Sequence, residues 1–414
     1  MKKILNSVKI AQKELAKLSA NERNELIFRI ASKVRENCAK ILAANAADLA
    51  NASDLNSAMK DRLKLDEARL NAICAGLESI AGQKEVIGEI KKGWVAKSGI
   101  KINQIAVPIG VIAAIYEARP NVTLEIAALA IKSANGCVLK GGKEARLTNL
   151  AFMEALNSAF LPLGFCSVAF LDISRDEVLE LLGMSEFIDM IVPRGGENLV
   201  RFVSENSRIP VLKHDKGLCH IYIDKAMELQ KALNIAINAK CSRPAVCNAA
   251  ETFLVHESVA SKFLSAVYPL LKEYNVEIFG CPKTAKIIEC KSASEQNYDT
   301  EYDDFKLNIK VVASIDEALA HIARYGSGHS EAIISEDYSA CQRFLSEVDA
   351  SCVFANASTR FNDGGEFGFG AEVGISTNRL HARGPVGVEG LTSYKYIIYG
   401  NGEVRYVLEL SFAS

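Results

Sequence analysis

Short apolar runs alternate with helical stripes from about residue 104 onward, and this alternation restricts the chain to few folds. The apolar runs have the length of buried strands, and the stripes between them have apolar residues at helical spacing. The predicted strands are residues 111–116, 137–140, 168–171 and 187–192, with a last one near Val211. The predicted helices are residues 121–135, 147–161 and 176–182, with another after Gly196. Buried strands that alternate with helices predict a doubly wound parallel sheet.

A second series of the same kind begins near residue 221. It predicts strands at residues 252–255, 310–312 and 332–335, and helices at 225–239, 259–271 and 315–325. Residues 291–308 are polar and acidic, which predicts a loop. A chain of 414 residues is long enough for two or three domains. The sequence therefore predicts an α/β protein with two doubly wound domains.

Two stretches fit neither sheet. Residues 94–105 alternate polar and apolar side chains, while residues 392–410 hold two β-type runs around Gly400-Asn401-Gly402. The second pattern predicts a β-hairpin with a glycine-rich turn. An isolated hairpin is only marginally stable, so we expect it to pair with another part of the chain or with another subunit.

Charge and cysteine content argue against several classes of function. The formal net charge is −2, which gives no basic field for a nucleic acid. No apolar run reaches the roughly 18 residues of a membrane span. The 11 cysteines are odd in number and lack zinc-site spacing, so we expect neither a disulfide framework nor a metal site. Reduced thiols in the cytoplasm are the simplest interpretation.

Two glycine-rich turns follow predicted strands and are candidate phosphate sites. They are Lys140-Gly141-Gly142-Lys143 and Pro193-Arg194-Gly195-Gly196. Ligands of doubly wound folds bind at the carboxyl ends of strands, where a helix that begins offers free N–H groups. A tight turn without any ligand explains either segment equally well.

Several longer segments, in addition to the second of these turns, carry a resemblance to a known family. They comprise residues 116–123 (YEARPNVT), 238–249 (NAKCSRPAVCNA), 325–332 (YGSGHSEA), 356–361 (NASTRF), 363–368 (DGGEFG) and 380–385 (LHARGP). Together they resemble the aldehyde dehydrogenase superfamily and, within it, the γ-glutamyl phosphate reductase family, in the same order and over nearly the whole chain. The resemblance implies three parts. They are a cofactor-binding domain (residues 1–93 and 106–222, with part of 362–390), a catalytic domain (223–361) and an oligomerisation flap (94–105 and 391–414).

The resemblance also implies a reaction, which is the NADPH-dependent reduction of L-glutamyl 5-phosphate to L-glutamate 5-semialdehyde in proline biosynthesis. Cys247 would be the nucleophile that forms a thioester, with Cys241 as a structural cysteine. Asn121 stands where the superfamily has its oxyanion donor, although an asparagine there also suits a helix N-cap. The matching stretch 213–220 has no glutamate to activate water, and Asp215 is too short to replace one. This absence favours reduction over hydrolysis of the thioester.

Cofactor and substrate residues follow from the same resemblance. Lys140 and Lys143 would favour the 2′-phosphate of NADPH, and Glu301 would correspond to the acid that holds the nicotinamide ribose. Arg119, Arg360 and Arg383 are candidate partners of the substrate's carboxylate and phosphate, with a structural ion pair as the alternative for each. We expect a homo-oligomer. Contact with the upstream glutamate kinase is a further hypothesis, because γ-glutamyl phosphate cyclises readily.

Two alternatives remain at this point. One is a member of the same superfamily that acts on another acyl phosphate or on an aldehyde. The other is a non-catalytic oligomer or binding module that keeps the fold, against which Cys247 and Asn121 argue.

Overall fold

The computed structural model describes residues 1–52, 57–117, 119–213 and 216–405, which form two compact units. The first unit comprises Met1–Arg194, Asn206–Val211 and the described part of Gly387–Ser414. The second comprises Gly195–Glu205 and Leu212–Val386. No helix in the described ranges combines the length and the apolar character that crossing a bilayer requires.

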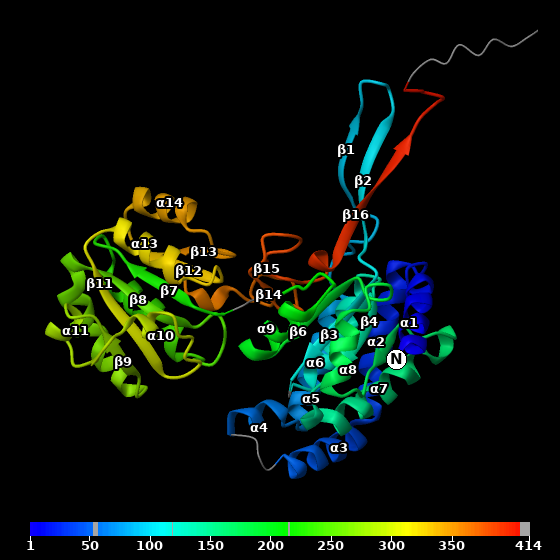
Figure 1. Cartoon of the computed structure of the whole chain (residues 1–414), viewed down its shortest axis with the longest axis horizontal. Helices are drawn as coiled ribbons and strands as arrows, with labels where there is room; N and C mark the ends of the chain where they lie inside the picture. Colours follow the sequence, from blue (N-terminus) through cyan, green and yellow to red (C-terminus); the bar gives the residue numbers. More distant parts are fainter. Residues whose placement is uncertain (53–56, 118, 214–215, 406–414) are drawn as a thin grey trace, which may run out of the picture. The chain divides into compact units, whose positions relative to one another are not determined.

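A parallel sheet of four strands forms the centre of the first unit, in the order β5-β4-β3-β6 (Figure 1). The strands are β3 (Val111–Tyr116), β4 (Gly136–Lys140), β5 (Val168–Phe170) and β6 (Met190–Arg194). The register places Ile115 beside Lys140 and Tyr116 beside Arg194, so three carboxyl ends meet at one edge. The predicted parallel sheet is confirmed. The strand predicted near Val211 is wrong, because Val211 makes only a single parallel bridge to Ile191.

Helices surround this sheet. They are α1 (Lys2–Leu15), α2 (Ala20–Glu36), α3 (Cys38–Asn51), α4 (Ser57–Leu63), α5 (Glu67–Ala81), α6 (Asn121–Lys132), α7 (Arg146–Phe160) and α8 (Arg175–Leu182). Short 3₁₀ turns η1 (Lys143–Ala145) and η2 (Leu161–Leu163) flank α7. Helix α6 packs on β3 and β4, and all its residues except Asn121 and Glu125 are buried. Its apolar sequence therefore reflects a helix that is covered on all sides.

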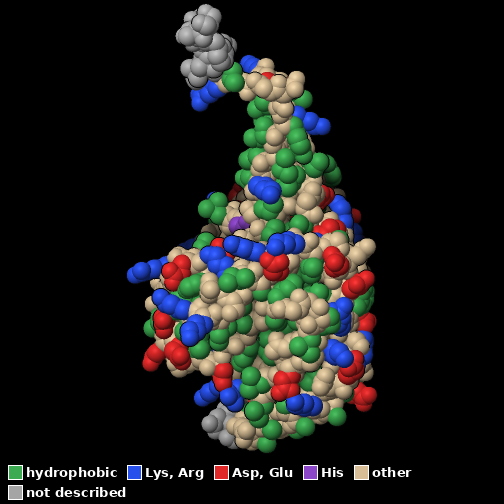
Figure 2. Space-filling view, turned by 90° about the vertical axis from the view of Figure 1, so that its right-hand side faces the viewer, with side chains coloured by type: hydrophobic (Ala, Val, Ile, Leu, Met, Phe, Trp, Pro, Cys, Tyr) green, Lys and Arg blue, Asp and Glu red, His purple; other side chains and the backbone are tan. Residues whose placement is uncertain are grey.

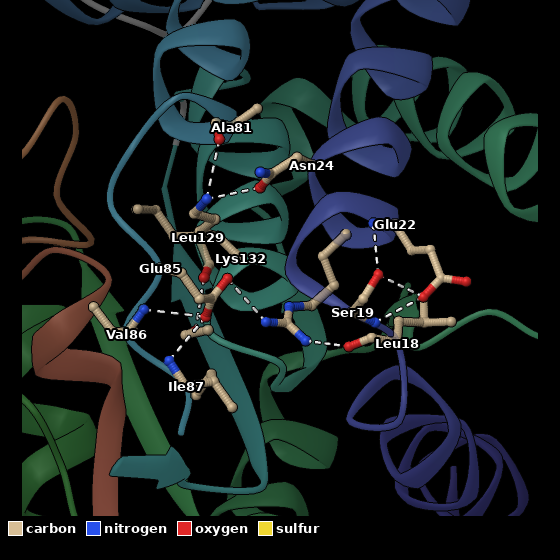
Figure 3. A network of polar contacts seen from close by, with 12 residues as sticks. Leu18, Ser19, Glu22, Asn24, Ala81, Glu85, Val86, Ile87, Leu129 and Lys132 are labelled. Atoms are coloured by element: carbon tan, nitrogen blue, oxygen red, sulfur yellow. Dashed lines mark hydrogen bonds and ion pairs between the residues drawn. The ribbon is translucent and has the colours of Figure 1, made fainter. Parts of the chain in front are cut away.

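Two buried cations tie the N-terminal helices to the segment that leads into β1 (Ile90–Val95) (Figure 3). Arg23 of α2 forms an ion pair with Glu85 at 2.9 Å, and its own side chain is 3% exposed. Lys132 at the end of α6 donates to Asn24 at 2.7 Å and to the Ala81 carbonyl at 3.0 Å. Buried charges need such partners, so this network fixes how α2, α5 and α6 meet.

A three-stranded antiparallel sheet, here called the arm, extends from the first unit. Its strands are β1 (Ile90–Val95), β2 (Lys101–Pro108) and β16 (Thr392–Tyr399), which follows the 3₁₀ turn η5 (Glu389–Leu391). The two stretches that fitted neither sheet thus pair with one another, because β2 lies between β1 and β16. The second strand of the predicted C-terminal hairpin falls mostly on residues that the structure does not describe, so the hairpin stays a prediction. β16 pairs with β2, and the expected residues 406–410 lie outside the described ranges.

The second unit contains a parallel sheet of seven strands, in the order β10-β9-β11-β8-β7-β12-β13. They are β7 (Cys219–Ile223), β8 (Ala250–His256), β9 (Glu277–Gly280), β10 (Lys291–Ser292), β11 (Lys306–Val312), β12 (Ser330–Ile334) and β13 (Cys352–Ala355). Helices α10 (Leu229–Cys241) and α11 (Glu257–Glu273) cover one face, whereas α13 (Ile315–Tyr325) and α14 (Tyr338–Glu347) cover the other (Figure 1). The remaining elements are α9 (Glu197–Asn206), α12 (Glu295–Tyr298), η3 (Thr284–Lys286), η4 (Thr359–Phe361), β14 (Ile375–Ser376) and β15 (Gly384–Pro385).

The second predicted sheet is confirmed, and three details differ. The predicted loop at 291–308 contains β10, α12 and the start of β11, because short polar segments there still pair with the sheet edge. The expected domain limit at residue 222 falls inside β7, which pairs with β8 and β12 of the second unit. Residues 362–386, expected partly with the cofactor domain, also belong to the second unit.

Candidate active site

The carboxyl edge of the first sheet gathers six of the nine residues expected to bind the cofactor. Lys140 ends β4, Gly141 to Lys143 follow it, and Pro193 and Arg194 end β6. A methyl group on Gly141 would lie 2.3 Å from Nδ2 of Asn149 and 3.1 Å from the Tyr116 ring. The backbone after β4 can therefore pass this close to α7 only because residue 141 has no side chain.

Both lysines at this edge are available to an anion. Neither Lys140 nor Lys143 forms an ion pair with another residue that the structure describes. Burial lowers the pKa of Lys140, which a nearby negative charge would offset. The buried Nδ2 of Asn149 also has no acceptor within the described part of the chain. These observations favour a turn that binds the phosphate of a dinucleotide over a tight turn that binds no ligand.

Asn121 is the first residue of α6, in the same unit. Pro120 occupies the N-cap position, and the Asn121 amide donates to the Glu125 carboxylate at 3.1 and 3.2 Å. The alternative of an N-cap for Asn121 is therefore wrong. Arg119 precedes this helix, where its backbone N–H donates to the Glu117 carbonyl at 2.5 Å.

In the second unit, Cys247 lies in the loop between α10 and β8. The Ala249 N–H donates to the Val246 carbonyl at 2.9 Å, so Cys247 is the second residue of a tight turn. The next residue, Asn248, is 3% exposed and donates to the carbonyls of Arg360 at 3.3 Å and Asn362 at 2.9 Å. Thr359 in turn donates to the Asn248 carbonyl at 2.7 Å. The turn η4 thus anchors the residue that follows the cysteine.

The start of β7 supports Cys247 from another direction. The Cys219 thiol donates to the Cys247 carbonyl at 3.2 Å, and burial raises the pKa of Cys219 well above its usual value. Cys219 therefore stays a protonated donor. A methyl group on Gly217 would lie 2.5 Å from Cα of Cys247 and 2.6 Å from Oε1 of Glu301. Glu301 and Cys247 thus both lie against the position that a side chain at residue 217 would occupy.

Burial raises the pKa of Glu301 to about 7, and the charge of Asp303 adds to this rise. A folded pKa above the usual 4.5 means that Glu301 favours the fold at low pH, and that this contribution is lost as the pH rises through 7. The free energy of unfolding of Glu301→Gln relative to that of wild type should therefore increase by roughly 1–3 kcal/mol when the pH is raised from 5 to 8. Urea denaturation at both pH values measures this gain. The substitution of an exposed residue, Glu273→Gln, serves as control. If both variants showed the same change of stability with pH, the raised pKa of Glu301 would be contradicted.

Other sequence-predicted residues are placed as follows. Cys241 ends α10, is 5% exposed, and has its pKa raised by burial to about 11, as suits a structural thiol. Arg360 lies over the loop of Cys247, where Nε donates to Ser242 at 3.3 Å and Nη1 to Asn248. Arg383 instead pairs with Asp349 at 2.8 Å. Gly195 and Gly196 precede α9 in the second unit, and Asp215 lies outside the described residues.

Comparison with known families agrees with this geometry. The model of the aldehyde dehydrogenase family matches residues 1–284, which is more than half of the chain. The chain belongs to the aldehyde dehydrogenase family. Members of this family use nicotinamide cofactors, which fits the edge that carries Lys140 and Lys143.

Relatives of similar length share much of the sequence. The γ-glutamyl phosphate reductases of a Sulfurovum species and of Sulfurimonas denitrificans are 50% and 48% identical, over 98% of this chain and 100% of theirs. A crystal structure of γ-glutamyl phosphate reductase from Thermotoga maritima is 43% identical, with a TM-score of 0.95 over 97% of this chain and 99% of that chain. An acetylating aldehyde dehydrogenase from Geobacillus thermoglucosidasius, 19% identical with a TM-score of 0.68, shares the fold.

Three residues around Cys247 were missed by the sequence reasoning. Asn248, Cys219 and Gly217 hold the loop through contacts that reach across 28 to 114 positions of the chain. The buried asparagine directly after Cys247 was the one available signal, because a polar side chain between apolar neighbours needs partners.

Proposed function

We propose that this enzyme reduces L-glutamyl 5-phosphate to L-glutamate 5-semialdehyde with NADPH and releases phosphate, as a cytoplasmic step of proline biosynthesis. The observation that carries the proposal is the loop of Cys247, which Asn248, Cys219 and Gly217 hold in one conformation. The full-length relatives named γ-glutamyl phosphate reductase supply the substrate class.

The proposed chemistry begins at Cys247. Its sulfur attacks the carbonyl carbon of the acyl phosphate, and phosphate leaves with the electrons of the C–O bond, so that a thioester remains. Asn121 and the backbone N–H of Cys247 donate to the oxygen that becomes negative during the attack. NADPH, when bound, supplies a hydride to the thioester carbon. Cys247 then departs as a thiolate and leaves the aldehyde.

Lys140 and Lys143 account for the choice of NADPH. Lys143→Glu should raise the KM for NADPH at least about tenfold, because an opposite charge then faces the 2′-phosphate, and should leave the KM for NADH nearly unchanged. Steady-state kinetics with both cofactors check this. Lys13→Glu is a matched control, because it makes the same charge change at the opposite end of β4. Its neighbour Gln12 packs at Gly136, where β4 begins. Equal losses with both cofactors would contradict a 2′-phosphate contact.

The arm accounts for the expected homo-oligomer. Its exposed apolar side chains include Trp94, Tyr394, Tyr396 and Ile398, which are 44% to 58% exposed, and Figure 2 shows apolar groups along its length. Such a surface is typical of an interface, and we propose that a second copy of the chain covers it. Contact with the upstream glutamate kinase remains part of the proposal, and cross-linking of the two enzymes would test it.

The reaction is tested in reverse, because the acyl phosphate is unstable. The assay supplies glutamate-5-semialdehyde, phosphate and NADP, and it follows the absorbance of the reduced cofactor. Reduction that requires phosphate supports the proposal. Reduction at the same rate without phosphate indicates an aldehyde oxidiser, and activity with another semialdehyde but not with this one indicates a different acyl phosphate.

A further inference from the structure

Two arginines lie at the loop that carries Cys247. Arg360 spans this loop, since its guanidinium donates to Ser242 at one end and to Asn248 at the other. Arg243 directly follows Ser242 and is exposed. Neither Arg243 nor Arg360 forms an ion pair with any residue that the structure describes. Two of the five N–H groups of the Arg360 guanidinium bind the loop, so the others remain for a ligand.

Arg360 donates to Ser242 at 3.3 Å, and Ser242 is the residue directly before Arg243, so both arginines lie at the same end of the loop. Burial lowers the pKa of Arg360, and the charge of Arg243 lowers it further. Asp363 opposes this effect, but its Oδ1 already accepts the N–H groups of Gly365 at 2.9 Å and Glu366 at 3.3 Å. Like charges held together without a paired carboxylate are destabilising until an anion binds. A dianion offsets both charges at once.

The chemistry of the substrate indicates which anion this is. In L-glutamyl 5-phosphate one oxygen atom separates the phosphorus from the carbon that sulfur attacks, whereas several carbon atoms separate that carbon from the α-carboxylate. Ser242 and Asn248, which hold Arg360, belong to the same loop as Cys247. An anion held by Arg243 and Arg360 is therefore the one next to the reacting carbon.

We propose that Arg243 and Arg360 together hold the phosphate group of the acyl phosphate beside Cys247, which rests on the proposed function. The two guanidinium groups bind the phosphate oxygens through charge-assisted hydrogen bonds and stabilise the dianion as the C–O bond breaks. In the reverse direction they hold inorganic phosphate. One phosphate oxygen then attacks the thioester carbon, and the C–S electrons return to the sulfur of Cys247.

The first test is Arg243→Gln, because exposed Arg243 takes no part in anchoring the loop. In the reverse reaction we expect the KM for phosphate to rise about tenfold or more, while the KM values for semialdehyde and NADP stay unchanged. The KM for phosphate of Arg243→Lys should lie between those of wild type and Arg243→Gln, because lysine keeps the charge and loses the bidentate geometry. Arg343→Gln is the control, because this partly exposed arginine pairs with Asp316 and Glu347 elsewhere in the unit.

A titration of the protein with inorganic phosphate by calorimetry separates this proposal from the proposed function. Wild type should bind phosphate, and Arg243→Gln and Arg360→Lys should both bind it more weakly, whichever acyl phosphate the enzyme reduces. An unchanged phosphate affinity in Arg243→Gln would overturn the proposal. A raised KM for semialdehyde with an unchanged KM for phosphate would also overturn it, because the arginines would then hold the carboxylate.

Discussion

Cys247→Ala is expected to lower turnover at least about a thousand-fold, because no other group in the proposed mechanism can form the thioester. The loop itself should remain in place, because Cys219 and Thr359 donate to the backbone carbonyls of residues 247 and 248, and the Asn248 side chain donates to the Asn362 carbonyl. Reverse-direction kinetics and thermal unfolding on the same preparation check both statements. The melting temperature should stay within a few degrees of wild type.

Cys241→Ala is the matched control for this substitution. It removes a buried thiol at the end of α10, so it costs on the order of 1 kcal/mol of stability and leaves turnover within about a factor of two. The reverse pattern, with activity lost in Cys241→Ala and kept in Cys247→Ala, would show that Cys247 is not the nucleophile.

Gly217→Ala is expected to have the second-largest effect, about a hundred-fold in turnover. The added methyl group would lie 2.3 Å from the carbonyl oxygen of Cys247 and 2.5 Å from its Cα, and both are backbone atoms that cannot rotate away. The loop must therefore shift, and overpacking of this kind costs roughly 1–3 kcal/mol. Turnover, urea denaturation and the alkylation rate of Cys247 by iodoacetamide measure the displacement.

Gly76→Ala provides the comparison for Gly217→Ala. Gly76 lies in α5 with no atom within 4 Å of the added methyl group, so alanine should be neutral or stabilise by up to about 1 kcal/mol. If Gly217→Ala behaved like Gly76→Ala, the close contact between the segment before β7 and the loop of Cys247 would be contradicted.

Much of the fold followed from the sequence, because buried parallel strands leave a local signal. All six residues of β3 are buried, and the apolar run at 111–116 matches that strand residue for residue. The loop of Cys247 and the lysines after β4 were found from segments that resemble a family. Both kinds of signal lie within a few neighbouring positions, so neither needs knowledge of the folded chain.

What the sequence did not predict depends on contacts between distant positions. The partner of β16 is β2, nearly 300 positions away, and no local pattern indicates that pairing. Within the polar stretch 291–308, β10 forms a short strand because it pairs with β9 at the edge of the sheet. Asn121 was given a possible capping role, yet its amide donates to Glu125, because the helix begins one residue earlier than that role requires.

The most direct test of the account mixes the enzyme with glutamate-5-semialdehyde and NADP, first without phosphate and then with it. Without phosphate, the thioester at Cys247 should form once per enzyme and accumulate. Reduced cofactor should therefore appear in a burst equal to the enzyme concentration, and the intact mass of the protein should increase by one glutamyl group. Addition of phosphate should discharge the thioester and start steady turnover. Reduced cofactor that accumulates at the same steady rate before phosphate is added would contradict the account.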